Sequence, residues 1–178
     1  ERFTSGMLVT PNADHLVMLQ ANCRFWDVYR RAEFVTVDSQ IVKWAMTFLG
    51  TPVKARLSGS DIFPAFCDFH RNDPSVRIFL LGGKDGIAVR AAERINARCG
   101  RRIVVGSQSP SMNFVNDPQE IDQIIEQIRA SGANVLAVGL GAPKQELWID
   151  AHRHRLPSVG RWMAIGATLD FEAGAVRR

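Results

Sequence analysis

The sequence predicts an α/β fold, a Rossmann-like parallel sheet with helices on both faces. Short runs of apolar and β-branched residues alternate with longer segments of helical periodicity along the whole chain. Glycines follow several of these runs, at the points where a strand must turn into a helix. Alternation of this kind builds right-handed crossovers and a parallel sheet that is covered on both faces.

Six strands and the helices between them follow from these patterns. The strands are expected at residues 7–10, 33–37, 76–81, 102–106, 134–138 and 161–165. The helices are expected at residues 14–30, 39–49, 60–70, 87–99, 117–131 and 144–154. Asp117 and Pro118 are typical of a helix N-cap and of the first helical position. No helix is expected after the last strand, and Trp26, Trp44, Trp148 and Trp162 are expected in the core.

A chain of 178 residues fits one domain, and we expect residues 1–178 to form a single α/β core. Because the chain opens directly before its first strand and closes on Arg177-Arg178, we expect this core to be truncated at both ends. Cys23, Cys67 and Cys99 lack the CxxC spacing. The cysteines therefore argue against a disulfide framework or a zinc site and favour a reducing cytosol.

The charge of the chain leaves several kinds of ligand open. The sequence holds 22 basic and 18 acidic residues, a formal charge of +4. This suits an anionic small molecule or a membrane surface. The basic residues are scattered and lack interleaved aromatics, so nucleic-acid binding is not expected. No stretch reaches the roughly 18 to 20 apolar residues that span a bilayer, so any membrane contact would be peripheral.

In open α/β sheets, ligands bind at the carboxyl ends of the strands, where helix N-termini present free N–H groups. The glycines at those predicted ends include Gly82, Gly83, Gly139 and Gly141. Glycine there lets a diphosphate approach the backbone closely. The Gly82-Gly83-x-x-Gly86 turn also fits an NAD site, or a turn that only packs a helix on a strand. NAD is disfavoured, because Val105-Gly106-Ser107 lacks the carboxylate that holds the ribose.

Asp38 is a lone carboxylate at the end of a predicted strand, directly before a predicted helix. It suits a helix N-cap and equally a general base that faces the same crevice as the glycines; both roles can hold at once. No Asp-x-Asp motif occurs, and Asp170-Phe171-Glu172 is the nearest approach to a metal-binding pair. We therefore expect no metal site, and a diphosphate would be bound without one.

Several segments together resemble one family. They are Thr10-Pro11-Asn12, Val37-Asp38-Ser39, Arg56-Leu57-Ser58-Gly59-Ser60-Asp61, Phe79-Leu80-Leu81-Gly82-Gly83, Gly139-Leu140-Gly141-Ala142-Pro143-Lys144-Gln145-Glu146, Gly166-Ala167-Thr168-Leu169-Asp170-Phe171 and Ala173-Gly174. In this order they resemble the WecG/TagA/CpsF glycosyltransferases, family 26 in the usual classification. The resemblance covers nearly the whole chain, and the Gly-x-Gly-x-Pro-Lys-Gln-Glu block is its most specific part.

The resemblance implies an inverting, metal-independent transferase that needs no cofactor. It implies a UDP-sugar donor of the N-acetylmannosamine, N-acetylmannosaminuronic acid, glucose or glucuronic acid type. The implied acceptor is an undecaprenyl-diphosphate-linked saccharide for wall teichoic acid, enterobacterial common antigen or exopolysaccharide. The implied place is the cytoplasmic, inner face of the plasma membrane. Membrane contact is expected through a family C-terminal segment that would follow Arg177-Arg178, and self-association is expected through the surface left uncovered without it.

The resemblance also implies roles for single residues. Asp38 matches the proposed catalytic base, and Thr10 and Asn12 match polar residues beside it. Arg56 and Gln145 match residues proposed to contact substrate. The further substrate-binding positions are Gly82, Gly83, Gly139, Gly141, Pro143, Lys144 and Glu146.

One departure from the family pattern lies beside the expected base. Ser39 replaces the usual glycine after the aspartate, which would narrow the space around the base. Two alternatives to the transferase stay open: a UDP-sugar-binding domain without turnover and a nucleotide-dependent oxidoreductase.

Overall fold

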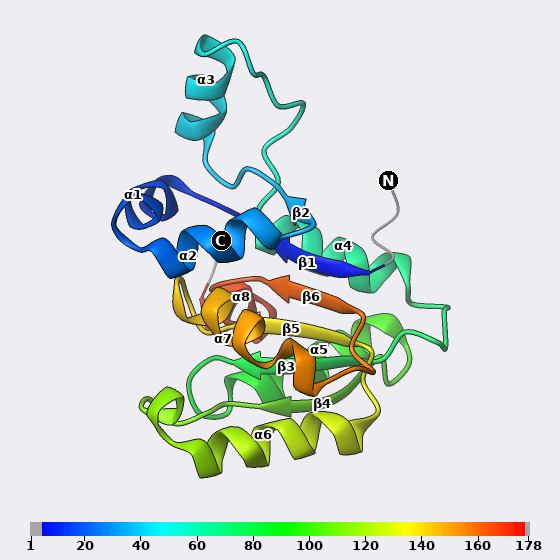
Figure 1. Ribbon diagram of the computed structural model, residues 1–178. Helices are drawn as coiled ribbons and strands as arrows, with labels where there is room; N and C mark the ends of the chain where they lie inside the picture. The colour runs from blue at the N-terminus through cyan, green and yellow to red at the C-terminus, as the bar shows by residue number, and fades with distance from the viewer. Residues whose placement is uncertain (1–4, 177–178) are drawn as a thin grey trace.

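A computed structural model describes residues 5–176, which form a six-stranded parallel sheet between helical layers (Figure 1). The strand order is β2-β1-β6-β5-β3-β4, and every neighbouring pair is parallel. The predicted Rossmann-like α/β fold is therefore confirmed.

All six predicted strands are present, with shifted ends. They are β1 (Gly6–Val9), β2 (Phe34–Val35), β3 (Ile78–Gly82), β4 (Val104–Gln108), β5 (Val135–Gly139) and β6 (Arg161–Ala164). Every residue of β3 is buried, because helices cover this strand on both faces. This burial explains its unbroken apolar sequence.

Two helical layers enclose the sheet. The helices are α1 (Ala13–Ala21), α2 (Cys23–Arg31), α3 (Gln40–Phe48), α4 (Gly59–Phe69), α5 (Ile87–Cys99), α6 (Pro118–Ser131), α7 (Lys144–His152) and α8 (Thr168–Glu172), with short 3₁₀ turns η1 (Phe114–Asn116) and η2 (Arg153–Arg155). Apolar residues of α4, α5 and α8 pack on one face of the sheet, and those of α2, α6 and α7 pack on the other. As predicted, Asp117 caps α6 and Pro118 is its first residue.

Two predictions about the helices were wrong. The helix expected at residues 14–30 is two helices, because Asn22 interrupts it. The Asn22 side chain accepts a 3.0 Å hydrogen bond from the Phe25 N–H and so starts α2. The second error concerns α8, which follows the last strand where no helix was expected. Its Leu169 is fully buried in the core, and this burial stabilises a helix too short to form alone.

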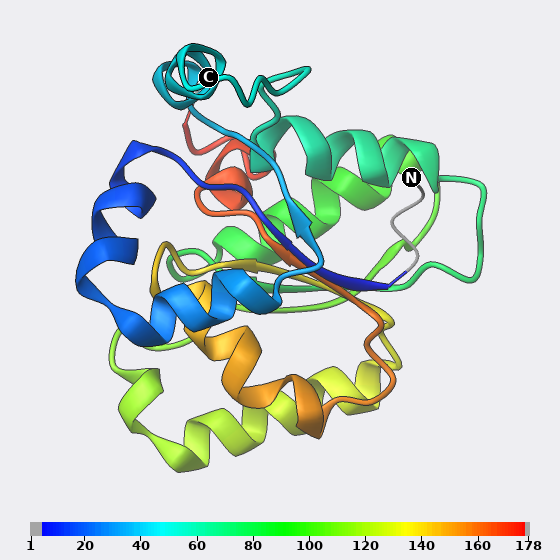
Figure 2. The same ribbon diagram turned by 45° about the horizontal axis from the view of Figure 1, so that its top comes forward.

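The prediction that the tryptophans lie in the core holds for half of them. Trp148 and Trp162 are buried, whereas Trp26 and Trp44 are exposed. Trp44 belongs to α3, which stands away from the helical layers (Figures 1 and 2). Within residues 5–176, no helix has the length and apolar character needed to cross a membrane.

Candidate functional site

Two neighbouring cavities open at the carboxyl edge of the sheet. The larger, about 710 Å³, lies beyond β3, β5 and β6 and is called here the glycine cavity. The smaller, about 350 Å³, lies beyond β1 and β6 and is called the Asp38 cavity. Gly141, Gly166 and Ala167 line both cavities. The two therefore form one crevice, at the edge where parallel α/β sheets bind their ligands.

The ends of β3 and β5 approach so closely that glycine is required. Gly82 has φ +133°, and a Cβ built on it would lie 2.2 Å from the Gly139 carbonyl oxygen. Gly83 has φ +73°, and its Cβ would lie 2.6 Å from Cγ2 of Ile87. The backbone here leaves no room for side chains, so Gly83 and Gly139 can present bare peptide groups to the glycine cavity.

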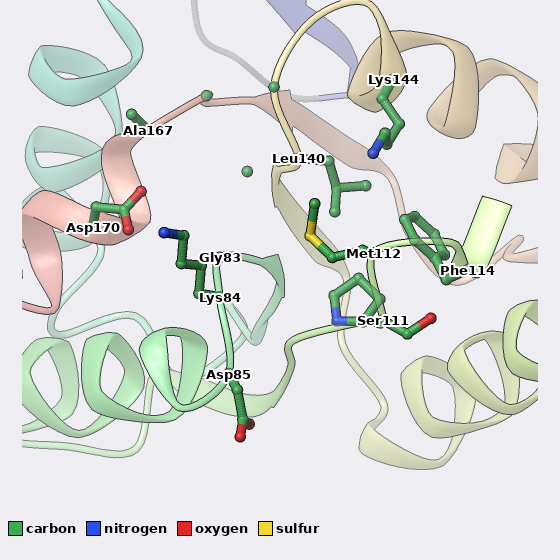
Figure 3. A pocket seen from close by; sticks show the side chains of 14 residues that line it. Gly83, Lys84, Asp85, Ser111, Met112, Phe114, Leu140, Lys144, Ala167 and Asp170 are labelled. Carbon is green, nitrogen blue, oxygen red and sulfur yellow. The ribbon is translucent and has the colours of Figure 1, made fainter.

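Two lysines supply positive charge to the glycine cavity. Lys84 follows the glycine turn, and Lys144 is the first residue of α7. Figure 3 shows their side chains extending toward the cavity from opposite sides, with Asp170 beside Lys84. Lysine ammonium groups and the helix N-terminus at Lys144 both favour an anion. The glycine cavity therefore suits a diphosphate group.

The Asp38 cavity is built where β1 and β2 run side by side. The Thr36 N–H donates to the Val9 carbonyl at 3.1 Å, and the Asp38 N–H donates to the Pro11 carbonyl at 2.9 Å. This pairing beyond the strand ends brings Asp38 next to the Thr10-Pro11-Asn12 segment. Thr10, Asn12 and Asp38 line the same cavity.

Arg56 holds the Asp38 side chain. Its Nη1 lies 3.3 Å from Asp38 Oδ1 and 3.3 Å from the Asp38 carbonyl oxygen, and its Nη2 lies 3.7 Å from Asp61. The N-cap alternative for Asp38 was wrong: Ser39 caps α3, with Oγ accepting from the Val42 N–H at 3.3 Å. The Asp38 carboxylate is about one-third exposed, at 31%, and faces a cavity instead of a helix end.

A buried polar network supports the wall between the two cavities. The Gly166 N–H donates to Gln145 Oε1 at 3.1 Å, and Gln145 Nε2 donates to Glu146 Oε1 at 2.9 Å. Glu146 is fully buried, and its Oε2 has no hydrogen-bond partner within residues 5–176. This burial raises the pKa of the Glu146 carboxyl. Gln145 thus fixes the Gly166 turn against a buried carboxyl group.

His15 belongs to the same buried region. It lines the Asp38 cavity, and its Nδ1 lies 2.5 Å from the Tyr29 hydroxyl. Burial lowers the pKa of His15, so the neutral ring is favoured at neutral pH. Burial and the charge of Glu146 raise the pKa of Tyr29, so the hydroxyl keeps its proton. A neutral, oriented imidazole therefore faces the cavity that holds Asp38.

The crevice collects most of the predicted site residues. Those lining it are Thr10, Asn12, Asp38, Gly83, Gly139, Gly141, Lys144 and Gln145. Arg56 joins them through Asp38. Three others lie elsewhere: Gly82 is buried at the end of β3, Glu146 is buried behind Gln145, and Pro143 lines a separate groove between α2 and α7.

Sequence reasoning assigned no site role to Lys84, Asp170 or His15, whose side chains line the crevice. Lys84 directly follows Gly82-Gly83, and this position could have signalled it. Asp170 was expected as part of a family segment and as half of an acidic pair but was given no role at the site, and the structure separates that pair, because Glu172 binds Arg98 at 2.7 Å. His15 stands at the start of the helix expected at residues 14–30 and was interpreted as part of that helix start, because its place in the cavity depends on the packing of α1 on α2. Across residues 5–176, no three His, Cys, Asp or Glu side chains cluster as metal ligands.

The chain matches one family over its whole length. The glycosyl transferase WecG/TagA/CpsF family model covers residues 1–178. The matched range includes both cavities and every residue that lines them.

Proposed function

Because the chain belongs to the WecG/TagA/CpsF family of glycosyltransferases, which act in cell-surface polysaccharide synthesis, we propose a specific reaction for it. The enzyme transfers a sugar from a UDP-sugar to an undecaprenyl-diphosphate-linked saccharide, with inversion and without a bound metal. One observation carries this proposal. A carboxylate cavity and a glycine- and lysine-lined cavity share the wall formed by Gly141, Gly166 and Ala167.

In this reaction Asp38 acts as the general base. The acceptor hydroxyl enters the Asp38 cavity and gives its proton to the Asp38 carboxylate while its oxygen attacks the anomeric carbon of the donor. The bond from that carbon to the UDP oxygen breaks, and UDP leaves with the electron pair. Attack opposite to the leaving group inverts the anomeric centre. Arg56, whose Nη1 lies 3.3 Å from Asp38 Oδ1, orients the carboxylate.

The glycine cavity receives the leaving diphosphate. Negative charge builds on that group as the glycosidic bond breaks, and preorganised donors lower the barrier. The donors proposed are the side chains of Lys84 and Lys144 and the backbone N–H groups of Lys84, Asp85 and Lys144, residues that line this cavity. They offer the positive charge that a metal ion supplies in other transferases, which supports metal-independent transfer.

The donor sugar is proposed to be of the N-acetylmannosamine, N-acetylmannosaminuronic acid, glucose or glucuronic acid type. The reaction is proposed to take place at the cytoplasmic face of the plasma membrane, where a UDP-sugar can meet a lipid-linked acceptor.

Calorimetric titration tests the donor half of the proposal. The ligands are UDP, UDP-N-acetylmannosamine, UDP-glucuronic acid and NAD, each with and without magnesium. We expect binding of the UDP compounds to be independent of magnesium, and no binding of NAD. Binding of NAD alone would contradict the proposal. If the protein is instead a binding domain without turnover, it will bind UDP-sugars but transfer no sugar to a lipid-linked acceptor. Wild type and Asp38→Asn would then both be inactive in the transfer assay.

A further inference from the structure

Helix α3 exposes an apolar face at the edge of the molecule that holds Asp38. Phe48 is 90% exposed, Ile41 68% and Trp44 65%. These residues are spaced three and four positions apart, so they lie on one side of the helix. Leu49, also exposed, continues this side beyond the end of α3. We call Ile41, Trp44, Phe48 and Leu49 the α3 face.

The α3 face differs from an ordinary protein surface in having several exposed apolar side chains on one helix. Single apolar side chains are common on protein surfaces, but several on one helix mark a contact surface. Of the described residues of α3, Val42 alone is buried. Figures 1 and 2 show the helix projecting from the body of the protein. The packing of the domain therefore does not explain why this helix is so apolar.

The charges around α3 identify the kind of surface that it fits. Residues 39–55 contain no Asp or Glu but include Lys43 and Lys54, whereas Arg56 is paired with Asp38 and Asp61. A helix with Trp and Phe on one side and lysines nearby is typical of contact with a membrane interface. Lysines near such a helix favour anionic lipid headgroups. This charge pattern favours an anionic bilayer over a second copy of a chain whose own charge is +4.

We propose that the α3 face docks on an anionic lipid bilayer. Ile41, Trp44 and Phe48 enter the boundary between headgroups and acyl chains, and Lys43 and Lys54 contact the headgroups. Asp38 lies two residues before α3, so docking brings the Asp38 cavity to the level of the headgroups. A saccharide attached to a lipid diphosphate is presented at that level. The docking surface goes beyond the transfer reaction, and vesicle binding measures it without any sugar transfer.

Cosedimentation with vesicles tests the proposal. The chain is mixed with vesicles of phosphatidylglycerol and phosphatidylcholine, or of phosphatidylcholine alone. We expect binding to the anionic vesicles only, weakened by about tenfold in Phe48→Ser. We expect about fivefold weakening for each lysine in Lys43→Gln and Lys54→Gln. Raising the salt concentration should also weaken binding.

Phe69→Ser is the matched control. Phe69 is 81% exposed at the end of α4, where the chain turns back toward the amino end of β3. The Phe69→Ser variant should bind anionic vesicles as tightly as wild type does. Because Phe48 and Phe69 are both exposed, neither change removes core packing, and circular dichroism should show both variants folded.

Several results would overturn the proposal. They are no binding by wild type, equal binding to neutral vesicles, or equal losses in Phe48→Ser and Phe69→Ser. Equilibrium sedimentation tests whether a second copy of the chain, rather than a bilayer, covers the α3 face. A dimer that Phe48→Ser converts to monomer, together with no vesicle binding, would assign the α3 face to a second copy. Loss of vesicle binding with intact transfer to a soluble acceptor would separate this surface from the catalytic proposal.

Discussion

The two cavities of the crevice are built in opposite ways. The glycine cavity takes its shape from backbone: β3 and β5 end in glycines whose peptide groups nearly touch, and lysines reach in from its rim. The Asp38 cavity takes its character from side chains, with a carboxylate, an imidazole and an amide held by hydrogen bonds. Backbone geometry suits an anion of constant shape, whereas positioned side chains suit proton transfer. Mutations should therefore be able to change donor binding in the glycine cavity and proton transfer in the Asp38 cavity separately.

The largest expected effect separates chemistry from binding. Asp38→Asn removes the proposed base and should lower kcat by about 10²- to 10⁴-fold. The affinity for UDP should stay close to that of wild type, because the glycine cavity is unchanged. Transfer assays and calorimetry measure the two quantities. Asp27→Asn, an exposed carboxylate on α2, is the control. Near-normal turnover in Asp38→Asn would refute the base assignment.

The second effect is on the backbone of the glycine cavity. Gly82→Ala places a Cβ 2.2 Å from the Gly139 oxygen at φ +133°, and should lower the free energy of unfolding by about 2–5 kcal/mol. Gly100→Ala has positive φ but open space around its Cβ, and should cost about 1–2 kcal/mol. Urea unfolding measures both variants. An equal decrease in the free energy of unfolding in both variants would show that the close approach of β3 and β5 adds nothing to the cost of Gly82→Ala.

The third effect is larger on donor binding than on turnover, the opposite of the effect expected for Asp38→Asn. Lys144→Gln removes a charged donor from the glycine cavity and should weaken UDP binding by about tenfold to 100-fold, the worth of a charge-assisted hydrogen bond. The turnover at saturating donor should fall less than it does in Asp38→Asn. Lys84→Gln tests the opposite side of the same cavity. Unchanged UDP affinity in both variants would remove the lysines from the donor site.

The smallest effect concerns the wall between the cavities. Burial raises the folded-state pKa of Glu146 above its unfolded value, so its contribution to stability is complete at acid pH and is lost as pH rises through the raised pKa. Glu146→Gln stays neutral and keeps an acceptor for Gln145. The Tm of this variant should therefore fall less than the wild-type Tm between about pH 5 and pH 8.

Glu93→Gln, an exposed glutamate on α5, is the matched control for Glu146→Gln and should leave the pH dependence of Tm unchanged. Identical pH profiles for wild type and Glu146→Gln would mean that the buried carboxyl does not titrate in this range.

Local pattern was sufficient for much of the molecule. The apolar runs predicted all six strands, and Asp117 with Pro118 predicted the start of α6. Gly82, Gly83 and Gly139 were expected at strand ends, where glycine lets a diphosphate approach the backbone. The structure adds that a Cβ at any of the three would clash with its neighbours. The family was evident from the residues themselves. Strand propensity, helix caps and glycine turns act between near neighbours in the chain, so a single sequence carries them.

Contacts between distant segments decided the rest. Ser39 rather than Asp38 caps α3, and this leaves the Asp38 carboxylate to Arg56 and the cavity. His15 enters the cavity because α1 breaks at Asn22 and packs on α2, and Glu146 is buried behind the Gln145 that it anchors. Trp44 is exposed because α3 leaves the core. Each of these outcomes depends on which surfaces meet after folding, and a one-dimensional pattern does not encode burial of that kind.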